Sequence, residues 1–398
     1  MSFAAVICAS HSANFAPSSG PGGALRAGLH FAGHSLVEYQ VRQAADAGAT
    51  HILILVSAVT PFLSQAVDRL TADKINVSLI RDMVSLVREA PRDRDMLLIA
   101  DGAIIAQNHF VSISQRSGNV LLAVDDSRVS APFERIDGQH RWAGLLRATP
   151  EVLFGTLDML GDWDLELTLM RAVVQAGAHR LIVSQEDILE GRVALIDSQA
   201  SADLVSQGLL SKGSDALSTD GGAEHYILSH AATRLAPMLL RTQVPASQIR
   251  IGGMALSTIG VIAAALGWPV FAILLMLGGL ILSLTSDRLG LLARRSHDTG
   301  WAALAPGIIA LIGFTVIGSE AGALMDGLYL SLLVGVILLA VRWRRTSFAK
   351  PWALFTPGSA LLVALVAIIL SGVNAALAVA TLCAIGSIGT IVLTDRKS

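Results

Sequence analysis

Asp101 is the residue best placed for chemistry in the first half of the chain. It follows the apolar run Met96–Ala100 and precedes a glycine, and ligands of α/β sheets bind beyond the carboxyl ends of buried strands. A carboxylate at such an end can hold a Mg²⁺ ion. An ordinary turn after a strand is the alternative that the residues alone leave open.

A loop rich in glycine, serine and proline spans His11 to Gly28, directly after the first apolar run. Backbone N–H groups in such a loop can form a nest around a phosphate, and a nearby arginine can hold one of its oxygens. The residues suited to this role are Gly20, Gly22, Gly23 and Arg26. A surface loop without a ligand fits the same composition.

The apolar pattern around these residues predicts alternating strands and helices. Strands are expected at 3–9, 51–56, 75–80 and 96–100, and helices at 35–47, 61–72 and 83–89. This alternation is typical of a mostly parallel sheet with helices on both faces.

Four segments of the first half resemble the sugar-phosphate nucleotidyltransferases. Phe31–Val56 is similar to the G-K-P-L-I-E-Y stretch of that family, and Leu97–Ala106 lies where the family places a Mg²⁺-binding aspartate. Arg141–Leu145 resembles its mid-domain strand. Val193–Leu204 resembles its W-x-D-V-D-T-P-E-D-L segment.

The resemblance implies a role for individual residues. Asp101 and Asp197 would hold Mg²⁺ and serve as the catalytic carboxylates, while Gly22, Gly23 and Arg26 would contact the nucleotide phosphates. His34 occupies the position of a phosphate-binding lysine, and a largely neutral histidine is a weaker anion partner. Gln199 stands where the family has a second acidic residue.

Composition separates the chain into two halves. Its 398 residues are 53% hydrophobic with a mean hydropathy of +0.60, which is too apolar for an ordinary soluble protein. Residues 251–398 contain 9 of the 29 Lys and Arg and 5 of the 31 Asp and Glu. The acidic first half has no basic patch of nucleic-acid type, so we expect no nucleic-acid partner.

The amino terminus and the cysteines indicate the compartment. The first ten residues lack the basic start and long apolar centre of a secretory signal, so we expect the first half to stay in the cytoplasm. Cys8 and Cys383 are the two cysteines, which are too few for a disulfide framework and fit packing roles.

A small, polar, glycine-rich stretch at 205–222 predicts a linker. The helix expected next, His225–Leu240, would lie along the membrane interface, with a domain-closing helix as the alternative. Its apolar side chains are Leu228, Leu235, Met238 and Leu239.

Six apolar segments follow, and most approach the ~20 residues that cross a ~30 Å hydrocarbon core. They lie at about 251–268, 269–285, 301–318, 326–341, 352–371 and 374–394. Every Lys and Arg of this half follows the second, fourth or sixth segment. The positive-inside rule therefore predicts a multi-pass protein of the inner (cytoplasmic) membrane with both termini in the cytoplasm.

The loop between the second and third segments carries Gly290-x-x-Ala293-Arg294. It resembles the second half of the CDP-alcohol phosphotransferase signature D-x-x-D-G-x-x-A-R-x8-G-x3-D-x3-D. The four acidic positions of that signature fall on Ser286, Leu289, Gly307 and Leu311, and these residues cannot replace carboxylates on divalent cations. Gly290 and Arg294 are then expected to permit close helix packing and to hold a phosphate or lipid headgroup.

The order of these parts resembles bifunctional fusions of inositol-phosphate cytidylyltransferase with a CDP-alcohol phosphotransferase. The resemblance implies an α/β nucleotidyltransferase-like domain with a Rossmann-like sheet at 1–205. A linker with an interfacial helix would occupy 206–250. An all-α membrane domain of six transmembrane helices would occupy 251–398.

Two functions follow as expectations. The first is a membrane-bound nucleotidyltransferase-like enzyme of polar lipid metabolism that uses CTP or a CDP-alcohol with Mg²⁺, binds an anionic lipid headgroup and lacks phosphotransfer in its membrane half. The second is a non-catalytic nucleotide- or lipid-binding scaffold for an active paralogue. A homodimer is compatible with both. A transporter fits less well, since no charged residue lies well inside a span.

Overall fold

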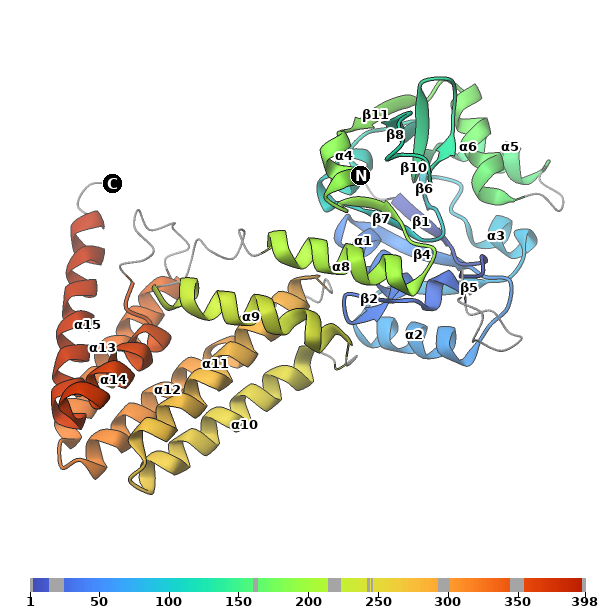
Figure 1. Cartoon of the computed structure of the whole chain (residues 1–398). Helices are drawn as coiled ribbons and strands as arrows, with labels where there is room; N and C mark the ends of the chain where they lie inside the picture. The colour runs from blue at the N-terminus through green and yellow to red at the C-terminus, as the bar shows by residue number, and fades with distance from the viewer. Residues whose placement is uncertain are drawn as a thin grey trace. The chain divides into compact units, whose positions relative to one another are not determined.

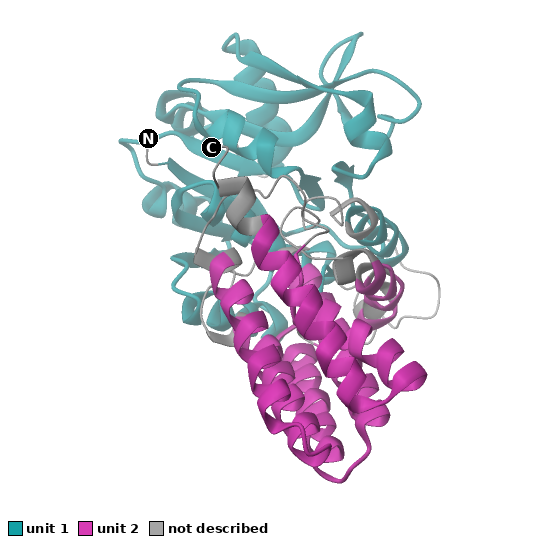
Figure 2. Cartoon of the chain, turned by 90° about the vertical axis from the view of Figure 1, so that its left-hand side faces the viewer, with its two compact units in different colours: residues 1–209 teal, residues 210–398 magenta. Residues whose placement is uncertain are grey.

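The computed structural model of the chain describes residues 3–13, 25–159, 164–213, 223–241, 244, 246–292, 301–343 and 354–395. The chain divides into two compact units, residues 1–209 and 210–398, which Figure 2 draws in different colours.

Unit 1 is built on an eight-stranded sheet of order β11-β8-β10-β6-β1-β4-β5, with β9 paired to β10 (Figure 1). Strands on this path pair in parallel except at β10, which runs antiparallel to its neighbours. The predicted mostly parallel α/β sheet is therefore confirmed. The bounds are β1 (Phe3–Cys8), β4 (Ala49–Leu55), β5 (Val77–Ile80), β6 (Met96–Ile99), β8 (Val120–Asp125), β9 (Glu134–Arg135), β10 (His140–Ala148) and β11 (His179–Val183).

The strand order reverses beside β1. Helix α1 (Leu36–Asp46) and helix α2 (Pro61–Ala72) connect β1 to β4 and β4 to β5, moving outward in one direction. Helix α3 (Met83–Glu89) then leads back to β6 on the opposite side of β1. Because such crossovers are right-handed, the reversal puts α3 on the other face, and it makes the space between β1 and β6 a topological switch point.

The two helical layers are held by different contacts. On one face, Arg69 of α2 binds Glu38 of α1 at 2.8 Å, and α4 (Gln107–Ser114) contacts α1. On the other face, α3 packs against α5 (Pro150–Leu157), which packs against α6 (Leu165–Gln175) (Figure 1). All six residues of β1 are buried between these layers.

Short elements surround the carboxyl edge of the sheet. They are the turn η1 (Arg26–Gly28), the hairpin β2 (His30–Phe31) with β3 (His34–Ser35), the pair β7 (Ala103–Ile105) with β12 (Val193–Leu195), and helix α7 (Gln185–Leu189). Helix α8 (Gln199–Gly213) follows β12. The linker was expected to begin at residue 206, but α8 continues helical to Gly213.

Unit 2 is helical (Figure 2). Three of its described helices are long and apolar enough to cross a membrane, namely Ala246–Ala265, Pro269–Gly290 and Val373–Thr390. The apolar stretches Leu304–Glu320, Leu324–Ala340 and Pro357–Ser371 are shorter. The full helices are α9 (Ala223–Arg241), α10 (Ala246–Ala265), α11 (Pro269–Leu292), α12 (Trp301–Glu320), α13 (Leu324–Trp343), α14 (Pro357–Ser371) and α15 (Val373–Asp395).

Helix α9 buries one of the apolar side chains that the sequence assigned to a membrane-interface face. Leu228 is 4% exposed in the core of unit 2, where α9 packs against α11 and α14. Leu235 and Met238 are exposed, as is Ile227. The helix therefore combines a face packed on the bundle with an apolar face turned outward.

Close helix packing occurs at glycines other than Gly290. A Cβ on Gly279 of α11 would lie 2.5 Å from the carbonyl oxygen of Gly253 on α10, so the two backbones are in contact there. No described atom lies within 4 Å of a Cβ on Gly290.

Candidate functional site

Asp101 lies at the switch point, directly after β6 and beside the end of β1. Its side chain is only 1% exposed. Its Oδ2 atom accepts a hydrogen bond of 2.7 Å from the backbone nitrogen of His11, which follows β1. The sequence placed Asp101 at a strand end, and the structure adds the neighbouring strand that contacts it.

The turn at Asp101 and Gly102 is held from several sides. Glu166 accepts from the Asp101 backbone nitrogen at 2.9 Å, and the backbone nitrogen of Ile196 donates to the Gly102 carbonyl at 2.8 Å. The side-chain nitrogen of Gln40 donates to the carbonyls of Ala100 at 3.1 Å and Ala103 at 2.9 Å. The Oδ1 atom of Asp101, by contrast, is buried and has no hydrogen-bond partner among the described residues.

Three ionisable side chains that the sequence did not single out surround Asp101. The ring of His11 lies between two carboxylates, with Nδ1 3.4 Å from Asp101 Oδ2 and Nε2 3.5 Å from Asp164 Oδ2. Asp164 caps α6 by accepting from the Glu166 backbone nitrogen at 2.7 Å. In the sequence, Asp164 and Glu166 are typical of the acidic first turn of a helix. For this reason the sequence did not indicate a site there.

Burial and charge shift the pKa values of this group. Desolvation of Glu166 raises its pKa to about 7, and the nearby Asp101 charge adds to this. The Asp101 carboxylate, 3.4 Å from the His11 ring, raises the pKa of His11 despite the opposing effect of burial. Desolvation, with Glu166 and Asp101 nearby, raises the pKa of the Cys8 thiol, which keeps Cys8 protonated and fits a packing role rather than a nucleophile.

Arg26 lies at the base of the glycine-rich loop. Ser12 and Leu25 form an isolated antiparallel bridge there, and the Arg26 backbone nitrogen donates to the His11 carbonyl at 3.0 Å. The Nε atom of Arg26 is buried without a hydrogen-bond partner among the described residues. The backbone of His11 therefore contacts both residues, through its nitrogen to the Asp101 carboxylate and through its carbonyl to the Arg26 backbone nitrogen. Gly20, Gly22 and Gly23 lie outside the described residues.

Asp197 reaches the same turn through β12. The β12–β7 pairing ends at Leu195 and Ala103, and the Ile196–Gly102 hydrogen bond continues it by one residue toward Asp101. Asp197 is half-buried, and Ser201 donates to its Oδ1 at 3.2 Å. The structure thus brings the backbone of Asp197 to the segment that carries Asp101.

His34 belongs to the β2–β3 hairpin, which is attached to the start of α8. Gln199 exchanges two hydrogen bonds of 2.9 Å with the backbone nitrogen and oxygen of His30. Gln199, which stands where the family has a second acidic residue, therefore fixes the β2–β3 hairpin that carries His34.

A Mg²⁺ ion at Asp101 would take most of its ligands from water and a substrate. Among the described residues, no three His, Cys, Asp or Glu side chains are grouped to hold a metal ion. Mg²⁺ commonly uses one or two carboxylates and takes its other oxygens from water and phosphates. The unpartnered Oδ1 of Asp101 offers one such ligand, with Asp197 as the candidate for a second.

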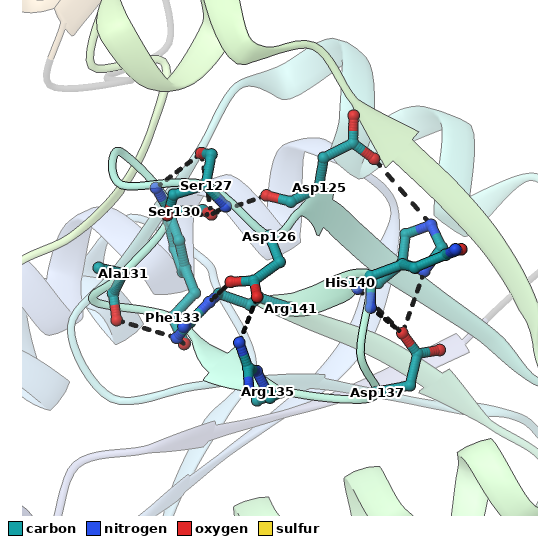
Figure 3. Close-up of polar contacts among 11 residues, drawn as sticks. Asp125, Asp126, Ser127, Ser130, Ala131, Phe133, Arg135, Asp137, His140 and Arg141 are labelled. Carbon is teal, nitrogen blue, oxygen red and sulfur yellow. Dashed lines mark hydrogen bonds and ion pairs between the residues drawn. The ribbon is translucent and has the colours of Figure 1, made fainter.

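A second charged cluster lies after β8 and contains the segment that resembles the mid-domain strand (Figure 3). Arg141 and Arg135 converge on the Asp126 carboxylate, with Arg141 Nε at 2.6 Å from Oδ1. Arg141 also donates to the carbonyls of Ala131 and Phe133 at 3.1 and 2.8 Å. These pairings hold the 126–133 loop in place, so the cluster has a structural role.

Three of the four signature positions of the membrane half contact neighbouring helices, and the fourth, Leu311, is half-buried. The Ser286 hydroxyl donates to the carbonyl of Ala246 at 2.6 Å, and Leu289 is 4% exposed in a cluster with Ala236 and Ile249. A Cβ on Gly307 would lie 3.1 Å from Leu338. Asp287 accepts from Arg250 at 2.7 Å. Arg294 lies outside the described residues.

An open groove of about 580 Å³ lies between α12 and α13. It is lined by Ile308, Leu311, Ile312, Thr315, Met325, Leu328, Tyr329, Ser331 and Leu332. Because none of these side chains is charged, the groove does not suit a phosphate-bearing substrate.

Comparisons with known proteins find similar solved structures but no related sequence. No family model matches the chain, and no curated protein matches its sequence. Among solved structures, the chain is similar to an inositol-1-phosphate CTP transferase from T. maritima, with 13% identity and a TM-score of 0.38. The match covers 52% of this chain and 95% of that one. A similarity of this size does not assign an activity to the chain.

Proposed function

We propose that unit 1 binds a pyrimidine nucleotide, CTP or a CDP-alcohol, together with Mg²⁺ at the switch point between β1 and β6. The observation that carries this proposal is that two buried polar atoms, Asp101 Oδ1 and Arg26 Nε, have no hydrogen-bond partner among the described residues, in two residues that both contact the backbone of His11. A magnesium nucleotide supplies a cation for the first atom and a phosphate oxygen for the second.

The proposed reaction is cytidylyl transfer to an alcohol phosphate such as inositol phosphate. A phosphate oxygen of the acceptor attacks the α-phosphorus of CTP, and pyrophosphate leaves with the electrons of the broken bond. Mg²⁺ offsets the charge on the phosphates. Asp101 and Asp197 would hold that ion, and Arg26 and His34 would orient the phosphates.

For unit 2 we propose six membrane spans in the inner membrane, both termini in the cytoplasm, and no phosphotransfer. The packing of Ser286 and Leu289 supports the last point, because both side chains are engaged within the bundle rather than facing an open site. Gly290 and Arg294 would contact an anionic lipid headgroup. Release of CMP from a CDP-alcohol panel by the full chain in lipid, if lost in Arg294→Ala, would contradict this proposal.

The decisive experiment for unit 1 is thermal shift of the full chain in detergent with CTP, UTP, ATP or GTP, with and without Mg²⁺. We expect the largest stabilisation with CTP and Mg²⁺, and its loss in Asp101→Asn. Asp125→Asn is the matched control, since Asp125 also ends a strand at this edge but its side chain is 58% exposed. Equal responses of the two variants would remove Asp101 from the site.

The alternative function is a nucleotide-binding scaffold without turnover. The departures from the family in the first loop and at His34 and Gln199 favour it. Pyrophosphate release from CTP with inositol phosphate and other alcohol phosphates separates the two functions, because a scaffold would bind CTP and release none.

A further inference from the structure

Gln40 is a buried polar residue on α1 that spans the turn carrying Asp101. It is 1% exposed, and its single side-chain nitrogen donates to the carbonyls of both residues that flank Asp101 and Gly102, namely Ala100 and Ala103. One amide group therefore links the end of β6 to the start of β7.

The helix that carries Gln40 is itself fixed. Ser35 and Glu38 form a capping box at its first turn, Glu38 binds Arg69 of α2, and Arg42 binds Asp73 just beyond α2. A side chain on such a helix holds its partners more precisely than one on a loop. Through the two hydrogen bonds of Gln40, α1 therefore fixes the position of the Asp101 turn.

Gln43 provides an internal comparison. It lies one helical turn after Gln40, is fully buried, and donates to the carbonyl of Ile105 at the far end of β7. Both glutamines hold a backbone carbonyl of the same segment, but only Gln40 holds the residues next to Asp101.

We propose that Gln40 is a positioning residue for the Asp101 carboxylate, and that it orients Oδ1 for a divalent cation bound with the nucleotide. This inference rests on the proposed function of unit 1. Without the two donated hydrogen bonds, the turn keeps its contacts with Glu166 and Ile196 but loses its link to α1. A carboxylate that must be ordered during binding then loses affinity for the ion.

The test is Mn²⁺ binding to the full chain in detergent, measured by the electron paramagnetic resonance signal of free Mn²⁺ in the presence of CTP. Asp101→Asn defines the background from other sites. We expect Gln40→Leu to weaken Mn²⁺ binding at least tenfold, while Gln43→Leu stays within twofold of wild type. Thermal unfolding without metal or nucleotide should show a similar loss of stability in both leucine variants.

Each outcome bears on a different claim. Equal Mn²⁺ affinity in Gln40→Leu and Gln43→Leu overturns the positioning role and leaves the proposed function standing. Wild type that binds no more Mn²⁺ than Asp101→Asn overturns both. If Gln40→Leu does not fold, Gln40→Met keeps a side chain of similar length without an N–H donor, and it should show the same tenfold loss.

Discussion

The backbone nitrogen of Ile196 donates a hydrogen bond of 2.8 Å to the carbonyl oxygen of Gly102. This contact joins the segment of Asp197 to the turn of Asp101, two parts of the chain that the family resemblance placed in one metal site. It also leaves no room for a side chain at residue 102, because a Cβ there would overlap the Ile196 carbonyl oxygen.

Gly102→Ala should therefore separate β12 from β7. Gly102 also has φ +84°, a conformation that alanine rarely adopts. We expect a loss of about 2 to 4 kcal/mol in the free energy of unfolding, from strain and overlap together, measured by denaturant unfolding of the full chain in detergent. Gly118→Ala is the control, since Gly118 has φ +82° but no atom within 4 Å of the added Cβ. A loss as large in the control would assign the whole effect to backbone strain.

Glu166 should make the stability of unit 1 depend on pH. Its pKa is about 7 in the folded chain and 4.5 ordinarily, so the folded state keeps its proton while the unfolded state releases it. The contribution of protonated Glu166 to the free energy of unfolding is full below pH 4.5 and is lost as the pH rises to about 7. At about 1.36 kcal/mol per pKa unit, this amounts to about 3 kcal/mol.

Glu166→Gln removes this titration and keeps an oxygen that can accept from Asp101. We expect its free energy of unfolding to fall less than that of wild type between pH 4.5 and 7. The same slope in both proteins would show that Glu166 ionises at its ordinary pKa.

Gly279→Ala should loosen the contact between α10 and α11. The added Cβ would lie 2.5 Å from the Gly253 carbonyl oxygen and would overlap the Ser257 hydroxyl. Overpacking of this kind costs about 1 to 3 kcal/mol, which a lower unfolding temperature in detergent would reveal. A Cβ added at Gly389 on α15 would have no atom within 4 Å. The control Gly389→Ala should therefore be neutral or slightly stabilising through helix propensity. An unchanged unfolding temperature in Gly279→Ala would contradict the close approach of these helices.

The membrane topology gives a fourth prediction. A reporter fused after Lys397 should lie in the cytoplasm, and one inserted near Gly322, between α12 and α13, should lie outside. Gly322 is in a turn between helices and has φ +71°, which makes an insertion there compatible with both helices. The opposite location at either site would exclude six spans with both termini inside.

The sequence by itself determined the α/β pattern of the first half, the apolar helices of the second, and the position of Asp101 after a buried strand. These features depend on local periodicity, so helices 61–72 and 83–89 have the same bounds in the sequence and in the structure. The outward face of the helix before the spans was assigned incorrectly at Leu228, because its burial depends on contacts with α11 and α14.

Only the tertiary structure placed the surroundings of Asp101. His11 is 90 positions away from it in the chain, and Glu166 is 65 positions away. Hydrogen bonds over such separations follow from the order and direction of the strands, which bring the ends of β1 and β6 together. The local sequence does not determine that order. For the same reason, Gln40 is in the sequence only one of several polar residues on α1.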